Sequence, residues 1–299
     1  ASAVTLWSAR AEQRIDPMTD QPEQKSPFPH AGGSLDTTKA AEQNPDVEDE
    51  QDRTDAESIR ADRAEEQALQ AEEAHADEPG LGGDGPQQQR PELTAEERTA
   101  AETLFGDRLE LAEKFVDHLC GTGIEHGLLG PREVPRMWSR HVLNCAVLAP
   151  ELPAGGEVAD VGSGAGLPGI ALAIARPDVE FMLIEPMERR VQWMDTVAKD
   201  LGLDNIRLIR ARAEEAVDEV MADVVTARAV SALKKLVPLT VPLLADEGEL
   251  MLLKGRSAEA EIDAASKAIS KHKLQRPEVL QPGGDLLEEP TTVVRCRRR

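Results

Sequence analysis

From residue 157 to residue 296, short apolar segments alternate with segments of helical periodicity, and this order restricts the fold more than any other feature. The apolar runs predict seven strands, at 157–162, 180–185, 206–211, 222–229, 248–255, within 273–281 and at 291–296. Helical segments separate the first five strands, at 167–176, 187–202, near 213–220 and 231–245. Strands joined by helices pair in parallel, whereas no clear helix separates the last two strands. The order therefore predicts an α/β fold with a mostly parallel sheet and one antiparallel edge strand.

The charge changes sharply along the chain. Residues 1–92 contain 8 Lys or Arg against 22 Asp or Glu, a net charge of −14, whereas residues 93–299 carry −8. The first segment has few large apolar residues, so it cannot bury enough surface to offset its chain entropy. We therefore expect a disordered acidic extension over residues 1–92.

Residues 93–150 predict a helical segment ahead of the sheet. Thr94 and Glu97 have the spacing of a capping box, in which a hydroxyl and a carboxylate satisfy backbone N–H groups at a helix start. Apolar residues recur at helical intervals in DRLELAEKFVDHLCGTGIEHG, and a further helix is expected over 134–149. Residues 151–299 are then expected to form the sheet-containing domain.

The glycine-rich segment DVGSGAGLPG follows the first predicted strand. In an open parallel sheet, ligands bind beyond the carboxyl ends of the strands, often at the first strand-to-helix turn. Gly162, Gly164 and Gly166 let the backbone approach a ligand without an intervening Cβ. The dinucleotide fingerprint GxGxxG fails because its sixth position is Leu167. The spacing acidic-x-Gly-x-Gly-x-Gly, starting at Asp160, instead resembles motif I of the S-adenosylmethionine-dependent methyltransferases.

Two carboxylates lie where such a cofactor would need them. Glu185 ends the second predicted strand, where it can accept hydrogen bonds from both ribose hydroxyls. Glu214 follows the third strand, where it and the neighbouring backbone could meet the adenine edge. Either residue alone would most often be a solvated surface carboxylate. Together with the glycines, they predict a methyltransferase.

Several motifs resemble a specific family, the bacterial 16S rRNA guanine-N7 methyltransferases, also known as small-subunit methyltransferase G or glucose-inhibited division protein B. The similarity covers roughly residues 94–299 and is most specific in SRHVLNCAVL, DVGSGAGLPGIALAIARPD, EPMERRVQWM, TARAVSALKKL and LLKG. One departure is HGLLGPREVPRMW, which stands where the family commonly has an Asn-Leu-Thr element.

The resemblance implies a class I methyltransferase fold, Rossmann-like with a seven-stranded sheet, and S-adenosylmethionine as the cofactor. It implies that the cofactor is contacted by Gly162, Leu167, Ala213, Glu214 and Arg228. Asp160, Gly164 and Glu185 belong beside them by the strand-end argument. The implied partner is 16S rRNA, in the small ribosomal subunit or an assembly intermediate.

Methylation at guanine N7 fits the residues present. N7 carries an exposed lone pair and loses no proton, so the transfer needs alignment, desolvation and support for positive charge, and no strong base. Methylation of an exocyclic amine commonly uses an Asn/Asp-Pro-Pro-Tyr/Phe motif, which this tyrosine-free chain lacks. Methylation at pyrimidine carbon 5 would need a nucleophilic cysteine poised at a strand end, and neither Cys145, on a predicted helix, nor Cys296, near the terminus, suits that role.

Candidates for contact with the RNA and for the reaction are Arg140 and His141 in the helix before the sheet, and Lys254 after the fifth strand. Arg and Lys hold phosphates, and Arg can also donate to guanine O6. His141 is equally well explained as a partly buried histidine that satisfies local backbone. Trp138 could stack on a base but is more usual as a core residue. Further candidates, each of which could be a solvated charge, are Arg136, Arg189, Arg190, Arg256 and the terminal arginines.

The sequence lacks the features of membrane, secreted and metal-binding proteins. No stretch approaches the ~20 apolar residues of a membrane span, and no secretory signal pattern is present, so a cytoplasmic location is expected. Cys120, Cys145 and Cys296 form no CxxC or paired histidine motif, so neither a metal site nor a disulfide framework is expected.

Two other functions stay open from the sequence. One is a methyltransferase of the same fold that acts on a small molecule or a protein. The other is a non-catalytic regulator that binds S-adenosylmethionine and acts on a partner through the acidic segment.

Overall fold

The computed structural model describes residues 90–299, so the expectation of disorder for residues 1–89 lies outside the described residues. The described chain begins with Arg90, whose guanidinium pairs with Glu113 and Asp117 of helix α3 (Leu109–His118) at 3.2 and 2.9 Å. The last residues of the predicted acidic extension thus already contact the helical segment.

Helix α2 (Ala95–Phe105) begins at the predicted capping box. The Thr94 hydroxyl accepts a hydrogen bond from the Glu97 N–H at 3.1 Å, and the Glu97 carboxylate accepts one from the Thr94 N–H at 3.0 Å. Helix α3 continues into a π-helical turn, Leu119–Gly123. The two helices predicted at the start of the folded part are confirmed.

The helix predicted over 134–149 is helical, but it is not one regular helix. It comprises a 3-10 helix (Pro131–Arg136), a π-helix (Met137–Leu143), α4 (Asn144–Ala146) and a 3-10 turn (Ala149–Glu151). Pro135 lies inside the first stretch and has no N–H for α-helical hydrogen bonding, which favours the irregular winding.

Seven strands form one sheet in the order β3-β2-β1-β4-β5-β7-β6. They are β1 (Glu157–Val161), β2 (Glu180–Ile184), β3 (Ile206–Ile209), β4 (Ala222–Arg228), β5 (Leu244–Lys254), β6 (Glu278–Leu280) and β7 (Thr292–Arg297). The first five strands pair in parallel, and β7 pairs antiparallel with both β5 and β6. The predicted strands and the antiparallel end of the sheet are confirmed. The antiparallel strand, β7, is not the edge strand itself. It lies between β5 and the edge strand β6, because the chain turns back after β6 and inserts β7 beside β5.

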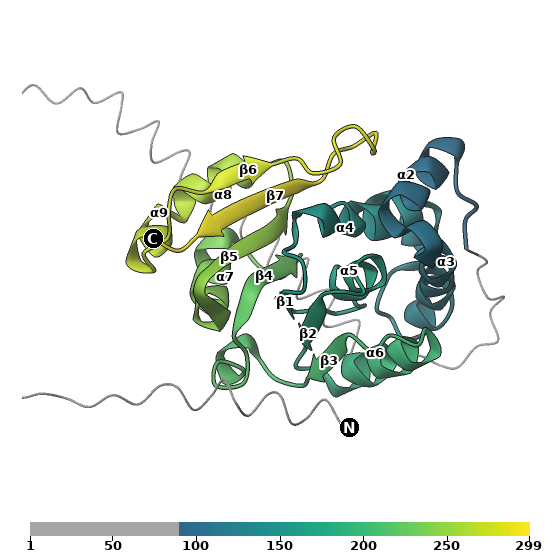
Figure 1. Ribbon diagram of the computed structural model, residues 1–299, viewed down its shortest axis with the longest axis horizontal. Coiled ribbons are helices and arrows are strands. Elements are labelled where there is room, and N and C mark those ends of the chain that lie inside the picture. The colour runs from purple at the N-terminus through teal and green to yellow at the C-terminus, as the bar shows by residue number, and fades with distance from the viewer. Residues whose placement is uncertain (1–89) are drawn as a thin grey trace, which may run out of the picture. The chain divides into compact units, whose positions relative to one another are not determined.

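Helices cover both faces of the sheet (Figure 1). One face packs against α5 (Gly169–Ala175) and α6 (Glu188–Asp200), and α2 and α3 pack on α5; Val158, Leu183 and Val224 are buried in the same apolar cluster. The opposite face packs against α7 (Leu233–Thr240), α8 (Ala258–Ala264) and α9 (Ser266–Lys271). This three-layer arrangement is the α/β architecture that the order of segments predicted.

Some helical segments differ from the sequence prediction. The segment near 213–220 is only a 3-10 turn, Ala213–Glu215, and α7 passes into the 3-10 turn Val241–Leu243 before β5 begins at Leu244. Helices α8 and α9 were not predicted. Each of these two helices buries only one residue, Ala258 in α8 and Ile269 in α9. The segment therefore has no strong apolar stripe that would predict helices.

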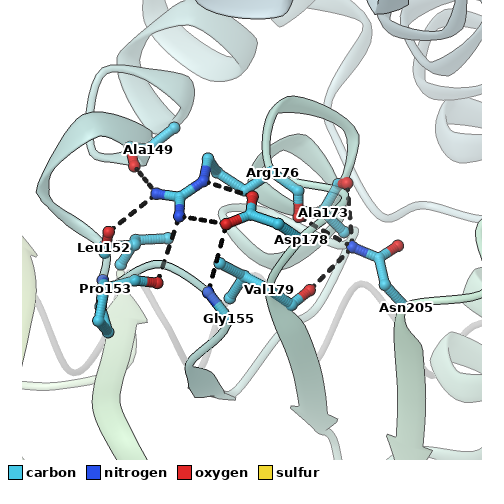
Figure 2. A network of polar contacts seen from close by, with 9 residues as sticks. All are labelled: Ala149, Leu152, Pro153, Gly155, Ala173, Arg176, Asp178, Val179 and Asn205. Carbon is cyan, nitrogen blue, oxygen red and sulfur yellow. Dashed lines mark hydrogen bonds and ion pairs between the residues drawn. The ribbon is translucent and has the colours of Figure 1, made fainter.

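A network of polar contacts joins the segments at the amino ends of β1, β2 and β3 (Figure 2). The Arg176 guanidinium donates to the carbonyls of Ala149, Leu152 and Pro153 and pairs with Asp178 at 2.7 Å. These contacts attach the end of the N-terminal helical segment to the α5–β2 connection.

Asn205 satisfies three carbonyls in the same network. Its side-chain amide donates to the carbonyls of Ala173, Arg176 and Val179 at 3.2, 3.1 and 3.0 Å, and the residue is 2% exposed. The sequence did not single out Asn205, because its partners lie more than 25 residues earlier in the chain.

No helix within residues 90–299 combines the length and the apolar character needed to cross a membrane.

Asn205→Ala is expected to lower the free energy of unfolding by about 2 kcal/mol, because it leaves buried carbonyls without a donor. Urea denaturation followed by circular dichroism measures the change. The exposed neighbour provides a control, since Asp204→Ala should change the free energy by less than about 0.5 kcal/mol. Equal effects of the two substitutions would contradict the role assigned to the amide.

Candidate functional site

The carboxyl ends of the parallel strands bring the predicted cofactor residues to one edge of the sheet. Asp160 is in β1, Gly162, Gly164 and Leu167 lie in the turn to α5, Glu185 follows β2, Ala213 and Glu214 follow β3, and Arg228 ends β4. This convergence follows from strand direction, since neighbouring parallel strands end at the same edge.

The turn from β1 to α5 leaves open space beside its backbone. Gly166 has a φ of +75°, and a Cβ there would lie 2.4 Å from Ile170 Cδ1, so the position requires glycine. Gly164 has a φ of +55°, but a Cβ there would approach only the Gly162 carbonyl oxygen, at 3.8 Å. A ligand could therefore come close to the main chain at Gly164.

The Glu185 carboxylate holds this turn from the end of β2. It is 2% exposed, and its oxygens accept hydrogen bonds from the N–H groups of Gly164 at 3.0 Å and Met187 at 2.9 Å. The Arg190 guanidinium lies 3.7 Å away. Each carboxylate oxygen can accept a second hydrogen bond, so acceptor capacity for ligand hydroxyls is left.

Asp160 is fully buried beneath the start of α5. One carboxylate oxygen accepts from the Gly169 N–H at 3.0 Å, and the other has no hydrogen-bond partner in the described structure. Thr226, the register partner of Asp160 on β4, is also buried with an unpartnered hydroxyl. Burial raises the pKa of Asp160 from 3.8 to about 7, and the nearby charge of Glu185 adds to the increase.

The 3-10 turn after β3 presents one predicted cofactor residue to solvent. Ala213 is buried, whereas Glu214 is exposed. The neighbouring Glu215 carboxylate accepts from the Arg212 N–H at 2.9 Å and fixes the start of the turn. Glu214 is therefore not tied into this local hydrogen bonding.

Arg228 joins the end of β4 to the irregular helix that precedes the sheet. Its Nη1 donates to the His141 carbonyl at 3.2 Å and to Cys145 Sγ at 3.0 Å, and its Nη2 lies 2.6 Å from His141 Nδ1. The next residue, Ala229, has a left-handed φ of +55°. Such backbone strain in a non-glycine residue is common at functional sites.

His141 is partnered on both ring nitrogens. Its Nε2 lies 2.7 Å from Glu133 Oε2, and only 6% of its side chain is exposed. Burial lowers the pKa of His141 to about 4, and the charge of Arg228 acts in the same direction. The ring is therefore buried and satisfied, through the side chains of Glu133 and Arg228 rather than through local backbone.

Lys254 is partly buried at the end of β5, with 9% of its side chain exposed, and contacts neighbouring elements. Its Nζ donates to the Ser231 carbonyl at 2.7 Å and pairs with the Glu261 carboxylate of α8 at 2.7 Å. The same carboxylate accepts from the Leu233 N–H at the start of α7. Lys254 thus has protein partners at the edge where it was predicted to act on the substrate.

Arg140 differs from its two fellow candidates because it is exposed. Its guanidinium makes no hydrogen bond or ion pair with any other residue in 90–299. Trp138, by contrast, is 1% exposed and donates through Nε1 to the Pro91 carbonyl at 3.1 Å, so it is a core residue.

The remaining basic candidates lie in other settings. Arg136 pairs with Glu133, and Arg256 is 94% exposed beside Glu289. Among the terminal arginines, Arg297 pairs with Glu249 at the middle of β5, and Arg298 pairs with Asp246 nearer the amino end of that strand. Because β7 runs antiparallel to β5, the chain ends at the edge opposite the cofactor residues.

Comparison with known proteins identifies the family. Residues 108–285 match the family described as rRNA small subunit methyltransferase G (GidB). The chain belongs to this family. The ribosomal RNA small subunit methyltransferase G of Pseudarthrobacter chlorophenolicus is 62% identical over 204 residues, which cover 68% of this chain and 94% of that protein. The protein of the same name from Thermobifida fusca is 46% identical over 196 residues, which cover 66% of this chain and 83% of that protein.

Membership of the methyltransferase G family confirms the resemblance found in the sequence, the fold class and S-adenosylmethionine as the cofactor. The residues present fit this group. Open space lies beside Gly164, and Glu185 and the unpartnered oxygen of Asp160 can accept hydrogen bonds from its hydroxyl and ammonium groups.

The sequence analysis missed four residues of the edge. Glu133, Cys145, Gly169 and Thr226 contact or adjoin predicted site residues. Gly169 is the last glycine of the glycine-rich segment, and Cys145 and Thr226 lie in segments that carry the family resemblance, but the sequence assigned none of the four a role at this edge.

The described residues contain no group of three or more His, Cys, Asp or Glu side chains arranged to hold a metal ion. Burial raises the pKa of Cys120 to about 11 and that of Cys296 to about 12, and it also raises the pKa of Cys145. Within residues 90–299, these thiols therefore do not have the low pKa of reactive cysteines.

Gly164→Ala is expected to abolish cofactor binding at modest cost to stability. The left-handed conformation would cost alanine about 1 kcal/mol, whereas the new methyl group would occupy the open space. Calorimetric titration with S-adenosylhomocysteine, together with thermal unfolding, separates the two effects. Unchanged affinity in the folded variant would contradict this placement of the cofactor.

Asp160→Asn is expected to change the pH dependence of stability. The folded state keeps the carboxyl protonated up to about pH 7, whereas the unfolded chain releases the proton near pH 3.8. The stability contributed by the protonated group is therefore lost as the pH rises from about 4 to about 7. The difference in melting temperature, variant minus wild type, should be more positive at pH 8 than at pH 5. An equal difference at the two pH values would reject the raised pKa of Asp160.

Proposed function

We propose that this chain transfers a methyl group from S-adenosylmethionine to N7 of a guanine in the 16S rRNA of the small ribosomal subunit. The observation that carries the proposal is the open turn at Gly164, held by Glu185 at the carboxyl edge of the sheet. Family membership supports the choice of small-subunit rRNA as substrate. Such a substrate would place the protein in the cytoplasm.

The side chains at this edge suit an acceptor that needs no base. The bound cofactor supplies an activated methyl group on a positively charged sulfur, and guanine N7 accepts it without losing a proton. His141 is neutral and has both ring nitrogens engaged, and Lys254 is paired with Glu261, so neither is free to remove a proton. The chain's contribution is then alignment of the two reactants and electrostatic support.

Arg140 is the residue that we assign to RNA contact. It is exposed next to His141, which itself touches Arg228 at the end of β4. An exposed guanidinium can hold a phosphate or donate to guanine O6. His141 and Lys254 would act on the reaction through the elements that they hold in place.

Purified protein, S-adenosylmethionine and small subunits that lack the modification should together produce 7-methylguanosine. Mass spectrometry of nucleosides from the recovered 16S rRNA detects it. Parallel reactions with naked 16S rRNA and an assembly intermediate identify the preferred form of the substrate. Absence of 7-methylguanosine from all three substrates, with cofactor binding intact, would overturn the proposal.

Arg140→Ala should lower the rate of this methylation by about tenfold and leave the affinity for S-adenosylhomocysteine unchanged, because one charged contact to RNA is lost. Lys199→Ala is the matched control. Lys199 lies in the last turn of α6 and pairs with Asp195, away from the carboxyl edge. Equal rates for the two variants would reject the RNA contact assigned to Arg140.

A further inference from the structure

Arg228 has donors left over after its contacts within the protein. A guanidinium carries five N–H groups in a fixed plane. Both Nη1 hydrogens and one Nη2 hydrogen are used, by the His141 carbonyl, Cys145 Sγ and His141 Nδ1. The Nε–H and the second Nη2–H donate to no atom within residues 90–299. These two donors are available to a ligand.

The contact with Arg228 defines the protonation of His141. A guanidinium only donates, so His141 Nδ1 must accept the hydrogen bond from Nη2. The imidazole proton then resides on Nε2 and is donated to Glu133 Oε2 at 2.7 Å. The charged groups facing the ring are Glu133, Arg140 and Arg228, and the imidazole is neutral because burial and Arg228 lower its pKa to about 4.

Glu133 is itself anchored in the helical segment. Its second carboxylate oxygen accepts from Arg136 at 2.6 Å. A continuous chain of contacts therefore runs from Arg136 through Glu133 and His141 to Arg228. It joins the 3-10 helix and the π-helix of the N-terminal segment to the end of β4.

We propose that Glu133 and His141 are positioning residues that orient Arg228, so that its two remaining N–H groups bind the carboxylate at the methionine end of the cofactor. This inference rests on the cofactor site of the proposed function. Paired N–H donors of a guanidinium match the two oxygens of a carboxylate. Arg228 is the one cation among the predicted cofactor residues, because Glu185 and Glu214 are acidic and the buried Asp160 carboxyl brings no positive charge.

The inference gives the N-terminal helical segment a part in cofactor affinity. If the ring of His141 loses its acceptor nitrogen, the Arg228 guanidinium loses a fixed orientation and the carboxylate loses a preorganised partner. The part of the cofactor without the carboxylate should bind as before.

The two amide substitutions of His141 separate its two hydrogen bonds. His141→Asn places an amide oxygen near the position of Nδ1 and keeps an acceptor for Arg228. His141→Gln places an amide nitrogen near Nε2, so it keeps a donor for Glu133 and loses the acceptor for Arg228. His118→Gln is the matched control, because His118 Nε2 also pairs with a carboxylate, that of Asp200 at 2.8 Å, between α3 and α6.

Calorimetric titration of the full chain with two ligands tests the inference. S-adenosylhomocysteine carries the carboxylate, and 5′-methylthioadenosine lacks the whole amino-acid part. His141→Gln should weaken S-adenosylhomocysteine binding by about tenfold or more and leave 5′-methylthioadenosine binding within about twofold. His141→Asn should retain most of the affinity for both ligands, and His118→Gln should equal wild type.

The remaining outcomes overturn the inference in distinguishable ways. The Nδ1 acceptor does not orient Arg228 if His141→Gln binds S-adenosylhomocysteine with wild-type affinity. The same conclusion follows if His141→Asn loses as much affinity for this ligand as His141→Gln does. An equal loss for both ligands would reveal a general structural defect. Failure of the wild-type chain to bind S-adenosylhomocysteine would overturn the proposed cofactor site itself. If His141→Gln does not fold, Glu133→Ala provides the same comparison, because it frees the imidazole to rotate.

Discussion

Two buried carboxylates hold the turn after β1 by accepting hydrogen bonds from backbone N–H groups. Glu185 binds the N–H of Gly164, and Asp160 binds the N–H of Gly169. The turn has few side chains of its own to pack, so the acceptors that the strands supply contribute to its shape. The parallel register of β1 and β2 places these acceptors, and the open space for the cofactor follows from it.

The two edges of the sheet serve different purposes. At the amino ends, Arg176 and Asn205 bind several backbone carbonyls and tie the connections together (Figure 2). At the carboxyl ends, Asp160 and Thr226 keep unpartnered polar atoms, and Ala229 adopts a left-handed backbone. At the carboxyl edge a ligand can satisfy such unpartnered atoms, while at the opposite edge the hydrogen bonds to backbone carbonyls contribute stability.

The N-terminal helical segment contacts the proposed site and is also part of the core. Its irregular winding buries Trp138 and Val142 in the hydrophobic layer and brings His141 to the guanidinium of Arg228. A regular α-helix interrupted by Pro135 could not form all of its hydrogen bonds, and π-helical stretches often occur where side chains must be redirected toward a site.

Local patterns in the sequence determined the strands, most helices and the edge at which the predicted cofactor residues meet. Strand periodicity, the capping box at Thr94 and the glycines after Asp160 are local properties, and the alternation of strands and helices then dictates a parallel sheet. Tertiary structure alone decided what surrounds the charged candidates. His141 and Arg228 are 87 residues apart in the sequence. No local pattern could show that they touch, that Lys254 pairs with Glu261, or that the terminal arginines lie at the far edge, because burial and pairing depend on segments that meet only in the fold.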